Sequence, residues 1–140
     1  MSSGESPLAG LIVIRRVLLA HLSNGEMGRG AYTPSKNDTD GLSFYDSALV
    51  APIQLVNASG KPPEMLKVFR VPSSAFVELN VPLKPSPDTG PSPLPGHYLA
   101  PTLNYVDYQD AKADTVSTAR RQAWLNMQNA LVERSEFVWP

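Results

Sequence analysis

The amino-acid sequence predicts an α+β fold, in which a mostly antiparallel sheet is followed by a C-terminal helix. The first observation is a succession of short runs rich in β-branched and aromatic residues, separated by segments rich in Gly and Pro, which is typical of antiparallel strands. The second is the stretch of residues 110–134, which lacks Gly and Pro and repeats apolar residues at steps of three and four. That spacing predicts one long helix with one apolar stripe, which Asp107 or Asp110 would cap.

The composition fits one globular domain over residues 1–140, whose single core would bury roughly two-thirds of the unfolded surface. We expect residues 1–10 to form a flexible N-terminus. Residues 82–96 read as a proline-rich loop, because proline donates no backbone hydrogen bond. The absence of Cys and the presence of only His21 and His97 exclude a disulfide scaffold, a thiol nucleophile and Cys- or His-rich metal sites.

The charge balance indicates no particular partner. The formal net charge is −1, so no global field favours nucleic acid or an anionic membrane, although local basic pairs are present. The first residues lack the positive region of a signal peptide, and Arg15 and Arg16 split the next apolar run well short of a membrane span. We therefore expect a soluble cytoplasmic protein, or one delivered to a target cell's cytoplasm without a signal peptide.

The first strand is expected within residues 11–22. Strand alternation places Arg15 on the face of Val13, and Arg16 on the opposite face with Ile14. One of the two guanidinium groups must therefore point toward a mostly apolar face. Such a group is costly to bury unless it lies at a rim, pairs with a carboxylate or meets an anion.

Residues 23–41 read as a loop whose glycines match no phosphate-binding pattern. The segment that follows places Ser43 on the strand face opposite to Leu42 and Phe44. Because Ser43 lacks the G-x-S-x-G elbow, serine hydrolysis is disfavoured.

Further strands are expected along the rest of the chain. Residues 52–57 and 66–71 would form one antiparallel pair, and residues 75–81 another short strand. The proline-rich loop leads into a strand that carries His97. The last six residues would form either a final strand or an apolar plug.

In the predicted helix, Arg120 and Arg121 lie beside Trp124. Two interpretations are open for this pair. The arginines form a solvated edge with their stems on the indole, or they bind phosphate.

The residues that point to chemistry are Arg15, Ser43, His97 and Tyr98, which lie on different strands of one small sheet. A cation, a hydroxyl and an imidazole that converge there suit a phosphate or dinucleotide: the arginine holds phosphate oxygens, and the serine and histidine hydrogen-bond a ribose. Paired carboxylates for acid–base catalysis are not evident.

Five segments carry a resemblance to a known family: VIRRV, GLSFYD, LKVFRV, HYLAP and ARRQAW. With them the chain resembles, over residues 14–124, the small toxins typified by exported effector two of the type VI secretion system. The resemblance implies a bacterial toxin that acts in the cytoplasm, an ADP-ribosyltransferase-like fold, a neutralising immunity partner and an unidentified cytoplasmic target.

Carried over by position, the resemblance implies that Arg15 is the arginine of the first strand, Ser43 the serine of the GTS-type motif and His97 the histidine of the HYxxxP segment. It implies NAD as the cofactor, bound by Arg15, Ser43, His97 and Tyr98, with Ser43 and His97 as the catalytic pair. Leu42 stands where the family has threonine, HYLAP is one residue shorter than the family spacing, and no glutamate matches the acid of many ADP-ribosyltransferases.

The alternative is a non-enzymatic interaction domain. It would bind a partner protein through Tyr98, Tyr105, Tyr108 and residues 137–139, since aromatic clusters suit interface anchors. The enzyme hypothesis requires Arg15, Ser43 and His97 to meet at one concave site.

Overall fold

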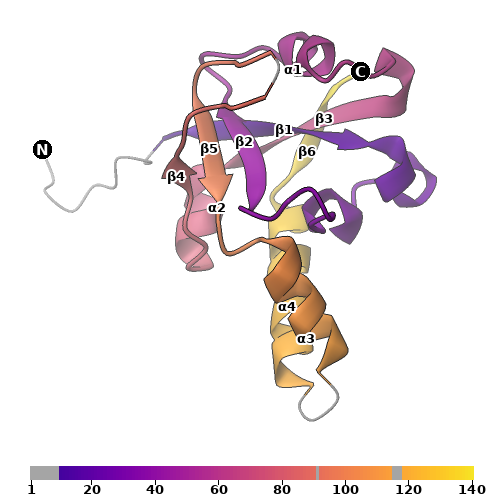
Figure 1. Ribbon diagram of the computed structural model, residues 1–140, viewed down its shortest axis with the longest axis vertical. Helices are drawn as coiled ribbons and strands as arrows, with labels where there is room; N and C mark the ends of the chain where they lie inside the picture. Colours follow the sequence, from indigo (N-terminus) through magenta and orange to yellow (C-terminus); the bar gives the residue numbers. More distant parts are fainter. Residues whose placement is uncertain (1–9, 91, 115–117) are drawn as a thin grey trace, which may run out of the picture.

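One antiparallel sheet organises the computed structural model, which describes residues 10–90, 92–114 and 118–140 (Figure 1). Within these residues the strands are β1 (Ile12–Leu18), β2 (Leu42–Asp46), β3 (Leu66–Pro72), β4 (Lys84–Pro85), β5 (His97–Ala100) and β6 (Glu136–Trp139). Their order in the sheet is β4-β5-β2-β1-β3-β6, and all five neighbouring pairs are antiparallel. The predicted α+β class is therefore confirmed. Apart from Gly10, the N-terminal segment expected to be flexible lies outside the described residues.

The helices of the described chain are α1 (Pro52–Ala58), α2 (Ser73–Glu78), α3 (Tyr105–Ala113) and α4 (Ala119–Glu133). Four short 3-10 turns accompany them: η1 (Leu19–His21), η2 (Ser23–Gly25), η3 (Arg29–Tyr32) and η4 (Pro63–Met65). None of these helices is long and apolar enough to cross a membrane. The first strand, expected within residues 11–22, ends at Leu18, because η1 follows it directly.

Two segments predicted as strands are helices. Residues 52–57 form α1, which starts at a proline whose fixed φ suits the first helical turn, while the Gln54 side chain accepts from the Ala51 N–H at 2.7 Å. Residues 75–81 fall largely in α2, which buries Ala75 and Phe76. The strand pairing predicted between residues 52–57 and 66–71 is therefore wrong, and β3 pairs with β1 and β6.

The predicted C-terminal helix is confirmed as α4, but its predicted extent over residues 110–134 is wrong, because α3 and α4 are separate helices that form a hairpin projecting from the sheet (Figure 1). The cap of α3 is Asn104, whose side chain accepts from the Asp107 N–H at 2.9 Å. The helix stops at Asp114, which has an extended backbone, and α4 starts only at Ala119. The last residues form β6, as one of the two alternatives predicted.

The core lies on both faces of the sheet. On one face Val13, Phe44 and Phe69 pack against α2 and α4. On the other, Ile14 and Tyr45 pack against α1. The residues just named are almost completely buried, so each face of the sheet is covered by helices.

The centre of the sheet splits. β1 pairs with β3 at seven positions, but with β2 at only two, Val13 with Asp46 and Ile14 with Tyr45. Beyond Ile14, β1 and β2 are no longer joined as a ladder. This parting leaves room for a site between residues of β1 and Ser43 of β2.

Gly41 tests how tightly β2 and β5 are docked. Its φ is +120°, and an added Cβ would collide with the main-chain oxygen of Ala100. We expect Gly41→Ala to lower the free energy of unfolding by about 3 kcal/mol, because strain and overpacking act together. Gly60→Ala is the control, since Gly60 also has positive φ but no atom within 4 Å of an added Cβ, and it should cost about 1 kcal/mol. Urea unfolding measures both, and equal losses would contradict the close approach.

Candidate functional site

Ser43 and His97 meet directly on neighbouring strands. Tyr45 lies opposite His97 and Ser43 lies opposite Leu99, so Ser43 and His97 are diagonal neighbours on one face of the sheet. His97 Nε2 lies 3.0 Å from Ser43 Oγ. The structure therefore brings together the two residues predicted as the catalytic pair.

The other ring nitrogen fixes the tautomer of His97. Nδ1 lies 2.9 Å from the main-chain oxygen of Ser86, which can only accept, so Nδ1 carries the proton and donates. In the neutral ring Nε2 is then the acceptor, and the Ser43 hydroxyl donates to it. The Ser86 N–H in turn donates to the His97 oxygen at 3.0 Å. This is the arrangement of a histidine base poised on a hydroxyl group.

Asp88 anchors the proline-rich loop beside His97. Its carboxylate accepts from the N–H groups of Gly90 and Leu94 and from the Tyr45 hydroxyl, at 2.9–3.0 Å. The Tyr45 ring lies 5.1 Å from the His97 ring. Burial alone would raise the pKa of Asp88, but these hydrogen bonds outweigh it and hold the pKa below its usual value. Burial, together with the bond to Asp88, raises the pKa of Tyr45 to about 12.

Arg15 links the parted strands through main-chain oxygens. Its Nη1 donates to the Ser43 oxygen at 3.2 Å and its Nε to the Ala31 oxygen at 3.4 Å, while the guanidinium lies 5.8 Å from the Phe44 ring centre. Burial lowers the pKa of Arg15 from its usual value, and the charge of Asp38 opposes this shift. Arg15 therefore positions the backbone of Ser43, and its hydrogen bonds do not involve the serine hydroxyl.

A cleft of about 290 Å³ opens where β1 and β2 part. Arg15 and Ser43 both line it. His97 lies just outside and reaches it through its bond to Ser43; it lines a neighbouring hollow together with Tyr98. Tyr98 pairs with Phe44 and packs partly against the core, and it is not among the residues that line the cleft.

Three charged residues of the cleft were not predicted as part of the site: Arg16, Asp38 and Lys61. Arg16 lies on the same sheet face as Ser43 and donates to the Leu55 oxygen of α1 at 2.9 Å. The alternation of side chains along the strand had placed Arg16 and Arg15 on opposite faces of the sheet, but it could not show which face carries the site. Both arginines reach the cleft because it opens beyond the end of the β1–β2 pairing.

Asp38 is the acidic residue among those described that line the cleft. Its Oδ2 accepts from the Ser35 N–H at 2.7 Å and from the Ser35 hydroxyl at 3.0 Å. The spacing Ser-x-x-Asp is a sequence signal for such a local turn, and would have been a means of finding it. Among the described residues, no group of three or more His, Cys, Asp and Glu side chains is placed to hold a metal ion.

The aromatic residues predicted to form a binding surface are divided among separate places. Phe137 packs against the core cluster that contains Phe44, whereas Trp139 packs against the cluster on the opposite face. Tyr108 contacts Trp124 in the helical hairpin.

Comparisons with protein-family models, with curated proteins and with solved structures found no match to this chain. The ADP-ribosyltransferase-like fold, which is finer than the α+β class, therefore stays a prediction.

The low pKa of Asp88 predicts a specific acid sensitivity. Since the carboxylate is favoured in the folded state, its contribution to stability is present above the unfolded pKa of roughly 3.9 and is lost as the pH falls through that value toward the folded pKa. We expect Asp88→Asn to lower the melting temperature at neutral pH. Between neutral pH and about pH 3, the melting temperature of this variant should fall less than that of the wild type. Tyr45→Phe removes one of the donors to Asp88, so its fall in melting temperature should lie between those of the wild type and of Asp88→Asn. Parallel melting curves for all three proteins would contradict the anchoring role.

Proposed function

We propose that the chain is a bacterial toxin domain of the ADP-ribosyltransferase type, which acts in the cytoplasm and transfers ADP-ribose from NAD to a target molecule. The observation that carries the proposal is the cleft between β1 and β2, where a Ser43–His97 pair adjoins basic side chains that form none of the ion pairs found among the described residues. The sequence motifs that resemble the exported effector two toxins support the same assignment, since Arg15 and Ser43 line this cleft and His97 contacts Ser43 from beside it. The same resemblance supports a neutralising immunity protein as a partner.

The charge of the cleft fits the pyrophosphate of a dinucleotide. Arg15, Arg16 and Lys61 line it, against Asp38 as the acidic residue. The guanidinium groups of both arginines donate to main-chain oxygens, so these hydrogen bonds hold them in place without neutralising their charge. The main-chain N–H of Lys61 donates to the Ser59 hydroxyl at 3.1 Å, which fixes the backbone at this residue. An anionic group in the cleft would add to the partial compensation that Asp38 gives these three cations.

When bound, NAD supplies an ADP-ribosyl group: the ribose–nicotinamide C–N bond breaks with its electron pair going to nicotinamide, and a bond forms from an electron pair of the acceptor, which loses a proton. The residues of the chain act around this exchange. Ser43 Oγ orients the ribose, and His97 Nε2 takes up the acceptor's proton through Ser43 Oγ. Asp38, which lines the cleft, would be the carboxylate that stabilises positive charge developing on the ribose.

The position of Ser43 argues against acyl transfer by the same pair. Nucleophilic serines of α/β-hydrolases lie on a strained turn between a strand and a helix, where backbone N–H groups form an oxyanion hole. Ser43 instead lies within β2 and is paired with β5. Its hydroxyl is suited to orient a substrate rather than to attack it.

The proposal predicts the loss of toxicity without loss of folding. Cytoplasmic expression of the intact chain should stop bacterial growth, and Ser43→Ala or His97→Ala should restore it at equal protein level. NAD turnover by the purified proteins should fall at least about 100-fold, the usual contribution of a positioned acid–base group. Asp38→Asn should lower turnover with less effect on NAD binding, because its role is in the transition state.

Ser47→Ala provides the matched control, because Ser47 is exposed and adjoins β2 without lining the cleft. Its growth arrest and turnover should equal those of the wild type, and circular dichroism should show the same fold for all variants. If folded Ser43→Ala and His97→Ala proteins remain fully toxic, this pair is not the catalytic site.

A further inference from the structure

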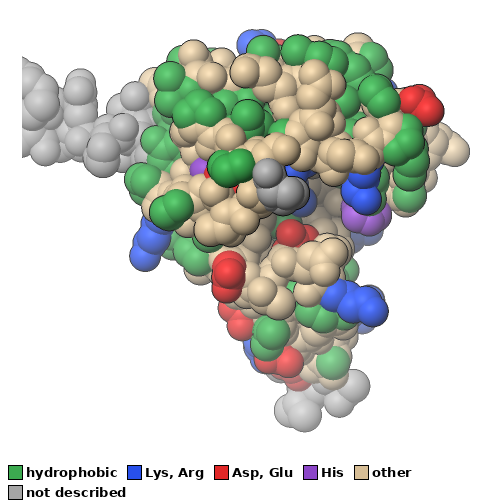
Figure 2. All heavy atoms as spheres, turned by 45° about the horizontal axis from the view of Figure 1, so that its top comes forward, with side chains coloured by type: hydrophobic (Ala, Val, Ile, Leu, Met, Phe, Trp, Pro, Cys, Tyr) green, Lys and Arg blue, Asp and Glu red, His purple; other side chains and the backbone are tan. Residues whose placement is uncertain are grey.

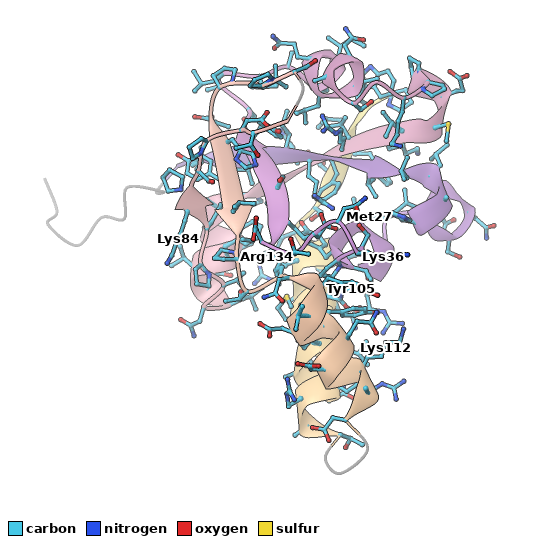
Figure 3. All side chains as sticks on the ribbon, viewed as in Figure 1. Met27, Lys36, Lys84, Tyr105, Lys112 and Arg134 are labelled. Atoms are coloured by element: carbon cyan, nitrogen blue, oxygen red, sulfur yellow. The ribbon has the colours of Figure 1, made fainter. Side chains whose placement is uncertain are left out.

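A second hollow lies between the helical hairpin and η3. It measures about 280 Å³, and its lining includes Arg29 of η3, Lys112 of α3 and Arg121 of α4. Figure 3 shows Lys112 on the hairpin, with Lys36 on the loop at its sheet end. The three cations of the hollow form none of the ion pairs found among the described residues, which join Arg70 to Glu136, Arg120 to Asp114 and Arg134 to Glu78. Their charge is therefore available to a ligand.

The same hollow presents aromatic surface. Tyr108 and Trp124 line it, with their rings 5.4 Å apart in an edge-to-face contact, and both residues are half-buried. The buried Gln128 ties this wall to the body of the protein, since its Nε2 donates to the Tyr32 oxygen at 3.0 Å and to the Thr33 hydroxyl at 3.3 Å. The aromatic side chains are thus held in place beside the cations.

This hollow adjoins the cleft between β1 and β2. Thr33 lines both of them, and it also lines a third, smaller hollow that includes His21 and Ser35, which border the cleft as well. We call the concave surface formed by these three hollows the basic groove. It runs from the α3–α4 hairpin, past Thr33, to Ser43.

Charge is strongly segregated along the basic groove. Of the 12 Lys and Arg residues in the sequence, six line it, whereas Asp38 is the one acidic residue among the described lining. Figure 2 shows the same separation on the hairpin, where acidic side chains gather along one side and basic ones along the other. A chain with a net charge of −1 therefore carries a local positive field along one groove.

We propose that the basic groove binds a single strand of nucleic acid. A base would lie against Tyr108 and Trp124, and the backbone phosphates would follow Arg121, Lys112 and Arg29 toward Thr33. Stacking on aromatic side chains beside a cationic track is how single strands are bound without strict sequence preference. The groove takes a single strand because unpaired bases alone can be splayed onto aromatic rings. An acidic protein would use the cations, but has no comparable use for the aromatic hollow.

We further propose that the bound nucleic-acid strand is the acceptor in the transfer reaction, and this part rests on the proposed function. A nucleic-acid strand bound in the groove would continue past Thr33 into the cleft, where it would reach Ser43 and, through it, His97. The strand would therefore be the acceptor of the ADP-ribosyl group, and a nucleotide oxygen or nitrogen would form the new bond and release its proton toward His97. Binding itself needs neither NAD nor catalysis, so the two proposals are tested separately.

The test is fluorescence anisotropy of a labelled single-stranded oligonucleotide of about 12 nucleotides, titrated with the full chain at low salt and without NAD. We expect binding that weakens steeply as salt rises, with a logarithmic slope of about −2 for three contacted phosphates. Arg121→Glu and Lys112→Glu should each weaken binding at least about tenfold, and should make the slope shallower. Trp124 fluorescence should be quenched by a stacked base.

Arg120→Glu is the matched control. Arg120 precedes Arg121 on α4 and is exposed, but it lies 4.0 Å from the Asp114 carboxylate and does not line the groove. Its affinity should stay within about twofold of the wild type, because a charge outside the groove contributes only long-range attraction. Equal weakening by Arg120→Glu and Arg121→Glu would overturn the proposal, since it would mean general attraction to polyanions.

Three further results would overturn it: no measurable binding at low salt, equal affinity for duplex DNA, or equal affinity for polyglutamate, which would favour an acidic protein partner. Failure of the proposed function has a different signature. In that case the oligonucleotide binds and Arg121→Glu weakens it, but labelled NAD gives no modified strand and the growth tests of Ser43→Ala and His97→Ala show no difference.

Discussion

The site depends on the contact between the Arg15 guanidinium and two main-chain oxygens, at the point where β1 and β2 part. After two paired positions the ladder between these strands ends, and buried carbonyl groups that lose ladder partners need other donors. Arg15 supplies a donor to the Ser43 oxygen of β2, and a second to the Ala31 oxygen of η3. A planar guanidinium with several donors can join β2 and η3 in this way, whereas an ammonium group cannot match the geometry. The cleft therefore stays open with a fixed wall, and the cation in a core strand has a structural reason.

The orientation of His97 comes from a loop that has little regular structure. A segment rich in proline has few N–H donors, so its carbonyl groups are left to accept from other parts of the chain. The Ser86 oxygen accepts from His97 Nδ1, and the two-residue strand β4 holds Ser86 against β5. Asp88 fixes the next part of the loop through Tyr45. The tautomer that lets His97 act as a base on Ser43 thus depends on contacts made by the proline-rich loop.

The sequence allowed the fold class to be predicted, together with the segments that became β1, β2, β3 and β5, because β-branched runs between turn residues are a local signal. It offered β6 only as one of two alternatives for the last residues. It failed at α1 and α2. These helices have two turns or fewer, and such short apolar runs have no periodicity that separates helix from strand. The break between α3 and α4 was missed for another reason: the apolar spacing of the sequence continues across it, whereas the cap at Asn104 starts the first helix early and the extended backbone of Asp114 ends it.

The site was predictable only in part. His97 contacts the Ser43 hydroxyl, and Arg15 the Ser43 main chain, through the strand order β5-β2-β1, which joins strands distant in sequence. Arg16, Asp38 and Lys61 come from a strand and two loops whose proximity no spacing rule gives.

Net charge does not describe the local charge of the basic groove, because folding separates charges that are mixed along the chain. Ion pairs such as Arg70 with Glu136 and Arg134 with Glu78 use acidic residues elsewhere on the surface. Arg15 and Arg16 keep their charge, because their guanidinium groups donate to main-chain oxygens, which orient a cation but do not neutralise it. The same feature serves both proposals. A cleft that holds a pyrophosphate and a groove that holds a phosphodiester backbone need the same unneutralised cations, and Thr33 lies where the two meet. One continuous surface can therefore bring a dinucleotide donor and a polyanionic acceptor together at Ser43 and His97.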